Sequence, residues 1–102
     1  MTFPTPPTDW VFDEPKNVAV FTTRQVIRDG SPILLVSHDA DDGSWQFHTG
    51  GAVSAADSMM IVALEEIVKH DSTVCELANL PLGWQAHRDS VDSPWRRLKR
   101  ED

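Results

Sequence analysis

The chain has 102 residues, of which 40% are hydrophobic and 25% are charged. This is typical of one globular domain that needs no metal or disulfide for stability. No apolar run approaches the ~20 residues of a membrane span, and the first residues lack the basic and apolar segments of a signal peptide. With a single cysteine, Cys75, the chain is expected to be cytoplasmic.

The formal net charge of −7 makes nucleic-acid binding an unfavoured function, because affinity for phosphate depends on clustered Lys and Arg. Four of the nine basic residues lie near the C-terminus: Arg96, Arg97, Lys99 and Arg100. We interpret this cluster as a solvated chain end. A contact with nucleic acid or with an acidic partner is the alternative.

Residues 1–16 hold four of the seven prolines and predict an extended arm anchored by Trp10 and Phe12. Residues 17–98 are predicted to form a single α+β domain, followed by a charged tail at 99–102. A short strand is expected over 18–21. Thr22 and Gln25 then have the spacing of a capping box, which predicts a short helix ending near Gly30.

Residues 33–48 read as a β-hairpin, closed at Asp42-Gly43 or by the four-residue loop 40–43. With either closure, the position numbers of two residues that face each other across the hairpin add up to an odd number. Trp45 and Phe47 should therefore face the core together with Leu34 and Val36. Ser37, Gln46 and His48 should lie on the opposite face.

Beyond a loop at 52–58, the apolar run 59–63 predicts a strand, and the spacing from Leu64 to His70 predicts a helix with favourably placed charges. Asp71 to Thr73 offers caps for a second short helix over 74–79, which Pro81 stops. Residues 83–88 alternate like a strand, and 95–98 predict a final edge strand. The expected fold is α+β, with a small antiparallel sheet of about five strands and one or two short helices on one face.

Several stretches form a recognisable set: 21–33, the run Asp42-Gly43-Ser44-Trp45-Gln46-Phe47, 67–72, and 80–83 with Arg88. Together they resemble a bacterial family of domains of unknown function that has a D-S-G-W-x-F-like signature. Some members of that family are predicted immunity proteins of polymorphic toxin systems. The resemblance covers roughly residues 18–97. It implies a protein partner such as a toxin, and it implies no reaction.

The sequence argues against metal or cofactor binding. In the acidic run from Asp39, the glycine falls at the fifth position of a would-be calcium loop, where the sixth is required, and Gly50 stands where a glutamate is needed. His38 and His48 have an even sum, which places them on opposite faces of the hairpin. No paired zinc-ligand spacing is present in the sequence.

The leading hypothesis is therefore a non-enzymatic binding module that contacts a basic protein. Its predicted surface consists of Asp39, Asp41 and Asp42 with Trp10 and Trp95, because exposed tryptophans mark contact surfaces. One alternative is a small hydrolase-like or metal-dependent enzyme that uses His38 or His48 with the acidic loop, with Cys75 as a further candidate side chain. The other is an accessory homodimer without a ligand.

Overall fold

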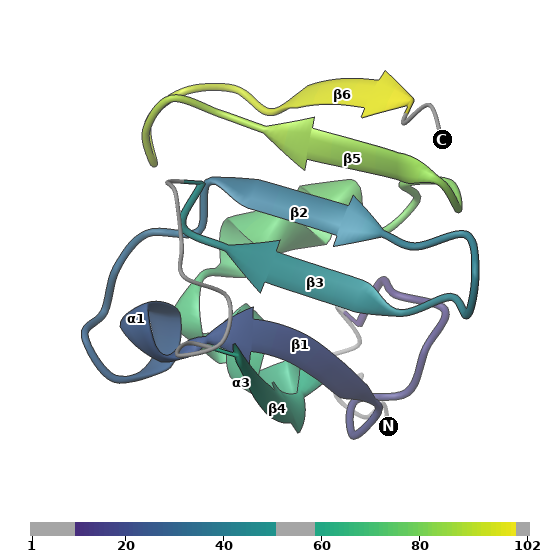
Figure 1. Ribbon diagram of the computed structural model, residues 1–102, viewed down its shortest axis with the longest axis horizontal. Coiled ribbons are helices and arrows are strands. Elements are labelled where there is room, and N and C mark those ends of the chain that lie inside the picture. Colours follow the sequence, from purple (N-terminus) through teal and green to yellow (C-terminus); the bar gives the residue numbers. More distant parts are fainter. Residues whose placement is uncertain (1–9, 51–58, 100–102) are drawn as a thin grey trace, which may run out of the picture.

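The computed structural model describes residues 10–50 and 59–99, which form one six-stranded sheet with the strand order β4-β1-β3-β2-β5-β6 (Figure 1). The strands are β1 (Ala19–Thr23), β2 (Leu35–His38), β3 (Trp45–His48), β4 (Met59–Ala63), β5 (Trp84–His87) and β6 (Arg96–Lys99). The helices are α1 (Arg24–Ile27), α3 (Leu64–His70) and the 3₁₀ helix η1 (Ser72–Leu77). The predicted α+β class is confirmed. The expected loop at 52–58 lies outside the described residues.

Most neighbouring strands run antiparallel, as predicted. The exception is β1, which lies parallel to β3 with Phe21 beside Gln46. The hairpin pairs Val36 with Phe47 and His38 with Trp45, so every facing pair has the odd sum that the sequence requires. Since Asp39 bonds Ser44 across the hairpin end, the closure is the four-residue loop 40–43.

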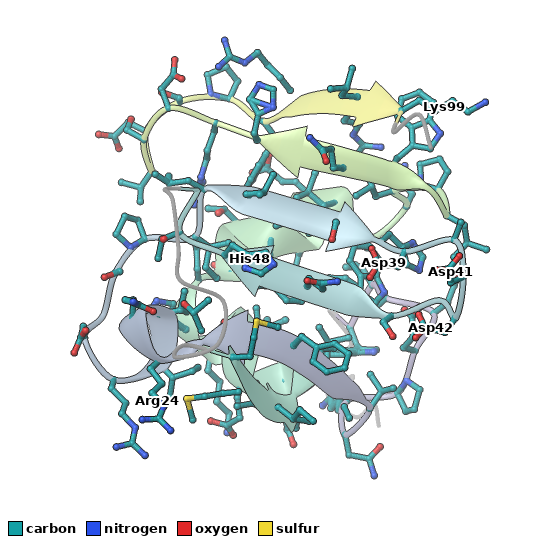
Figure 2. The ribbon with its side chains drawn as sticks, viewed as in Figure 1. Arg24, Asp39, Asp41, Asp42, His48 and Lys99 are labelled. Carbon is teal, nitrogen blue, oxygen red and sulfur yellow. The ribbon has the colours of Figure 1, made fainter. Side chains whose placement is uncertain are left out.

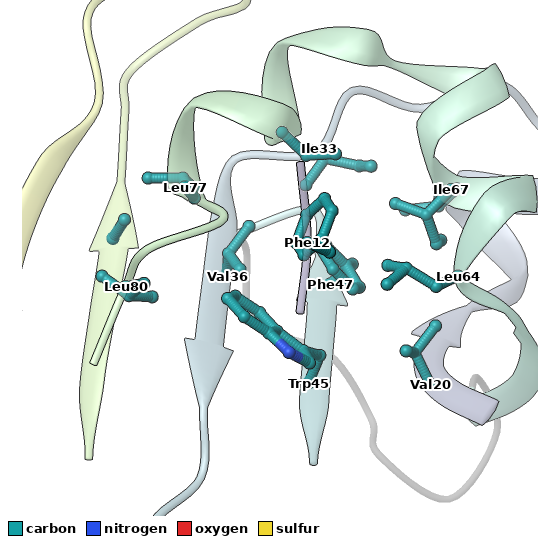
Figure 3. Packing of buried hydrophobic residues seen from close by; sticks show 13 residues of the cluster. Phe12, Val20, Ile33, Val36, Trp45, Phe47, Leu64, Ile67, Leu77 and Leu80 are labelled. Atoms are coloured by element: carbon teal, nitrogen blue, oxygen red, sulfur yellow. The ribbon is translucent and has the colours of Figure 1, made fainter. Parts of the chain in front are cut away.

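The sheet has one covered face. Helices α3 and η1 lie behind it in Figure 1, and the segment that precedes β1 packs on the same side through Phe12. Trp45 and Phe47 point into this layer, where their side chains are 1% and 0% exposed. Figure 3 shows them between Val36 on β2 and the helical residues Leu64 and Ile67.

The aromatic rings make the centre of this core. Phe12 meets the Trp45 ring edge-on at 5.3 Å between centroids, and Trp10 lies 5.6 Å from Phe12. In the described part of the expected arm, residues 10–16, Trp10 and Phe12 therefore pack against the core. Aromatic pairs of this kind contribute about 0.5–1.5 kcal/mol beyond the area they bury.

Two local predictions are wrong in detail. Strand β1 continues to Thr23, which pairs with Met59, so Thr23 and not Thr22 caps α1 by accepting a bond from the Val26 amide. Thr22 is instead buried, and neither its hydroxyl nor the side-chain amide oxygen of Gln25 has a hydrogen-bond partner among the described residues. Pairing with β4 therefore shifts the cap by one residue.

The second helix is also displaced from its predicted range. It is a 3₁₀ helix that begins at Ser72, because the Asp71 carboxylate accepts bonds from both the amide and the hydroxyl of Thr73. The strand at 59–63, the helix at 64–70 and the edge strand near 95–98 are present. Within the described residues, no helix is both long and apolar enough to cross a membrane.

Replacing Phe47 tests the inward face of the hairpin. The Phe47→Ala variant should lose about 3–5 kcal/mol of unfolding free energy, because a buried ring is removed and a cavity remains. Urea denaturation followed by tryptophan fluorescence measures this loss. The control is Leu98→Ala at a side chain that is 52% exposed, for which we expect a change below about 1 kcal/mol. A comparable loss in both variants would contradict the assigned faces.

Candidate functional site

The loop between β2 and β3 is held in one shape by its own hydrogen bonds. The Asp39 amide donates to the Ser44 carbonyl at 2.8 Å, and the Gly43 amide donates to the Asp39 carbonyl at 3.0 Å. Gly43 has φ of +75°, which a residue with a side chain rarely adopts. Asp42 has ordinary negative φ, so the positive angle expected of the Asp42-Gly43 pair falls on the glycine alone.

Acidic side chains gather at this end of the sheet, as Figure 2 shows for Asp39, Asp41 and Asp42. Asp41 and Asp42 are exposed. The Asp42 carboxylate accepts a bond from the Ser44 amide at 3.0 Å, and this bond, assisted by the Ser44 hydroxyl, lowers the pKa of Asp42. The loop therefore presents fixed negative charge at neutral pH.

Asp39 is linked to a histidine along the face of the sheet that lies opposite the helices. The Gln46 amide nitrogen donates to the Asp39 carboxylate at 2.6 Å, and His48 Nε2 lies 3.0 Å from the Gln46 side-chain oxygen. Burial lowers the pKa of His48, and the negative charge of Asp39 acts in the opposite direction. The contacts form one polar chain, Asp39–Gln46–His48.

Trp10 belongs to the same end of the molecule. Its indole N–H donates to the Glu14 backbone carbonyl at 2.7 Å, while the Glu14 carboxylate accepts a bond from the Trp45 indole at 2.9 Å. That carboxylate lies 3.7 Å from Nε2 of His38, whose ring stacks on Trp45 at 4.0 Å. Trp45 begins β3 directly after the acidic loop, so Trp10 and Glu14 sit close behind the loop.

Trp95 is not brought to this surface. Its ring packs 4.1 Å from the Arg88 guanidinium, which donates two bonds to the Ile33 carbonyl. Ile33 precedes β2 and Asp39 follows it, so the two ends are separated by about 20 Å at the usual rise of a strand. The structure therefore places Asp39, Asp41 and Asp42 at one end of the hairpin, connects Trp10 to Trp45 through Glu14, and leaves Trp95 at the far end of β2.

The arginine beside Trp95 serves the fold. Arg88 is 4% exposed and forms a 2.7 Å ion pair with Asp71, and it also donates to the Thr73 hydroxyl. It thereby links β5, the start of η1 and the segment before β2. Burial raises the pKa of Asp71, but the bonds from Thr73 and Arg88 outweigh burial, and the net shift is downward.

The histidines and the cysteine considered for catalysis or metal binding do not come together in one site. His38 and His48 lie on opposite faces, as predicted, and the described residues contain no group of three or more His, Cys, Asp or Glu side chains that could hold a metal ion. Cys75 is partly buried against the core, beside a hollow of ≈ 330 Å³ on the helical side. A second hollow of ≈ 360 Å³ lies near Leu35 and His87. None of the three loop aspartates lines either hollow.

Glu14 and Gln46 were not predicted as site residues, although Glu14 bonds Trp45 at the loop end of β3 and Gln46 connects Asp39 to His48. The alternation of β3 was a usable signal for Gln46, because it puts Gln46 and His48 on one face at a spacing of two. Glu14 offered no such signal, since its contacts depend on the path of an irregular segment.

Searches of family models, curated proteins and solved structures find no match to this chain.

The contribution of the Arg88–Asp71 ion pair to stability should depend on pH. Asp71→Asn should lose about 3 kcal/mol of unfolding free energy at pH 7, because a buried guanidinium loses its counter-charge. Since the pKa of folded Asp71 lies below its unfolded value, the ion pair contributes fully above about pH 4 and is lost as the pH falls through the folded pKa. Urea unfolding at pH 7 and pH 3 should therefore show the two proteins converging in acid. A difference in unfolding free energy between the two proteins that stays constant with pH would contradict this account. The control is Asp92→Asn, at an exposed site.

Proposed function

We propose that this protein is a non-enzymatic binding module whose acidic hairpin end contacts a basic surface of a protein partner. The observation that carries the proposal is the fixed loop that holds Asp41 and Asp42 in solvent. Asp39 and Glu14 add negative charge behind them. Charge complementarity of this kind mainly raises the association rate and selects the partner.

The rigidity of the loop supports binding. Three hydrogen bonds define its conformation. Two are between backbone groups, from the Gly43 amide to the Asp39 carbonyl and from the Asp39 amide to the Ser44 carbonyl, and the third runs from the Ser44 amide to the Asp42 carboxylate. A surface that is already ordered loses little conformational entropy when a partner docks. The indole of Trp10, which lies close behind, supplies an aromatic side chain of the type enriched in interfaces.

The resemblance to predicted immunity proteins suggests what the partner is. The signature residues Asp42 to Phe47 form the end of this loop and most of β3. An immunity protein binds a toxin and prevents it from acting, and a basic toxin surface is a suitable counterpart for an acidic loop. We therefore propose a toxin as the partner, encoded beside this chain.

Reversing one loop charge tests the proposal. The Asp41→Lys variant should bind the protein encoded by the adjacent gene with an association rate constant about three- to tenfold lower at low salt. The difference should shrink as ionic strength rises, because salt screens exposed charges. Biolayer interferometry across a salt series measures both effects, and co-expression growth assays report protection.

The matched control is Asp92→Lys, which makes the same charge change at an exposed residue near Trp95, away from the hairpin. It should associate at the wild-type rate. Asp41 is preferred over Asp42, whose carboxylate closes the loop. Association that does not depend on salt, or equal slowing by both variants, would reject the acidic loop as the contact surface.

A small hydrolase is the second candidate, favoured by the chain of contacts from Asp39 through Gln46 to His48. A histidine whose pKa is lowered by burial is neutral at pH 7 and can accept a proton. If this site is catalytic, His48→Gln should reduce hydrolysis of p-nitrophenyl esters or phosphates about 100-fold, with or without added Zn²⁺.

The control for that test is His87→Gln, because His87 is also a half-buried histidine and points from β5 on the same face. Activity that is equal in wild type and His48→Gln would exclude a catalytic His48. Unchanged binding of the adjacent gene product by His48→Gln would separate the two candidate functions.

A further inference from the structure

The two edges of the sheet differ in charge. The edge strand β6 carries Arg96, Arg97 and Lys99, and charged side chains are a usual device that prevents edge strands from pairing with other chains. The opposite edge strand β4 has the sequence Met-Met-Ile-Val-Ala and carries no charge. One edge of this sheet is protected, and the other lacks that protection.

The outward backbone groups of β4 can be identified from its pairing with β1. The Leu64 amide donates to the Val18 carbonyl, and backbone groups alternate in direction along an antiparallel strand. Even-numbered residues of β4 therefore bond to β1. Met59, Ile61 and Ala63 direct their amides toward the open edge, and no described strand lies beyond it.

Apolar side chains accompany these outward amides. Ile61 is 64% exposed and Met59 is 39% exposed, and both lie on the sheet face opposite the helices. Ile61 pairs with Phe21 on the neighbouring strand, which adds a half-buried ring beside it. A short apolar edge whose outward amides face no described strand is the kind of template to which another strand adds.

We propose that β4 pairs antiparallel with β4 of a second copy of this chain, around a two-fold axis at Ile61. The axis sets Ile61 opposite the partner's Ile61 and Met59 opposite the partner's Ala63. Because Ile61 directs its amide and carbonyl outward, this register forms a hydrogen-bonded pair at the axis. The two sheets then join into one continuous sheet, as closed two-fold assemblies allow.

The ends of β4 suit this self-pairing. Met59 lies beside Thr23 and the exposed Arg24, whereas Ala63 leads into Glu65 and Glu66. Figure 2 shows Arg24 on the β4 side of the molecule. Antiparallel pairing brings the basic end of one copy to the acidic end of the other. Charge complementarity between the two ends of β4 favours a second copy over an unrelated strand, although Lys69 at 3.6 Å offsets part of the Glu66 charge.

Sedimentation equilibrium of the full chain tests the proposal. Because the interface consists of a short strand, we expect a reversible dimer with a dissociation constant of about 1–100 μM. The Ile61→Lys variant should weaken it at least about tenfold, since two lysines then face each other at the axis. Ile61→Pro should also abolish it, because proline removes the outward amide and is tolerated on an edge strand.

The matched control is Leu98→Lys. Leu98 ends the same cross-strand row as Ile61, on the same face but at the β6 edge, and is 52% exposed. Its dimer should form as in wild type. A wild-type monomer up to about 500 μM, a dimer that survives both Ile61 variants, or equal weakening by Leu98→Lys would overturn the proposal. Circular dichroism checks that each variant is folded. If Ile61→Pro is not folded, the result for Ile61→Lys alone tests the proposed dimer.

Discussion

The alternation of side chains along β3 is the constraint on which the rest of this structure depends. Trp45 and Phe47 enter the core, and the pleat then obliges Gln46 and His48 to lie on the opposite face. A shift of one residue would expose both rings and bury a histidine. The large apolar area of the two rings makes that shift costly, so one pairing register is specified.

The same register determines the chemistry available on each face. It stacks His38 on Trp45 beside the Glu14 carboxylate, and it lines up His48 with Gln46 and Asp39 on the other side. Two histidines that are close in the hairpin thus have separate carboxylate neighbours. The acidic loop closes the hairpin at the end where Trp45 begins β3, and the Trp45 indole N–H donates there to the Glu14 carboxylate.

The sequence was informative where short-range rules apply. Strand alternation predicted the faces of Trp45 and Phe47, and apolar spacing predicted the helix from Leu64. The capping box at Thr22 was wrong, because pairing with β4 continues β1 through Thr22 to Thr23, two residues beyond the expected end of the strand.

Long-range arrangement explains the remaining differences. The parallel pairing of β1 with β3 depends on which strands meet in space, which a single chain does not encode locally. Trp95 was expected beside the hairpin because of its residue type, but its position follows from Arg88, whose side chain is held by Asp71, Thr73 and the Ile33 carbonyl. Of the candidate site, the loop aspartates could be predicted from turn chemistry, and the Glu14 contact could not.

The two proposed contact surfaces are compatible because they use different boundaries of one sheet. The acidic loop lies at an end of β2 and β3, whereas β4 is a lateral edge. A two-fold axis at Ile61 reverses strand direction between copies, so the two acidic loops point in opposite directions. A dimer of this form would therefore bind two partner molecules, one at each end, and would not clamp a single partner between its loops. Avidity for one partner is excluded by that geometry, and each loop must supply its own affinity.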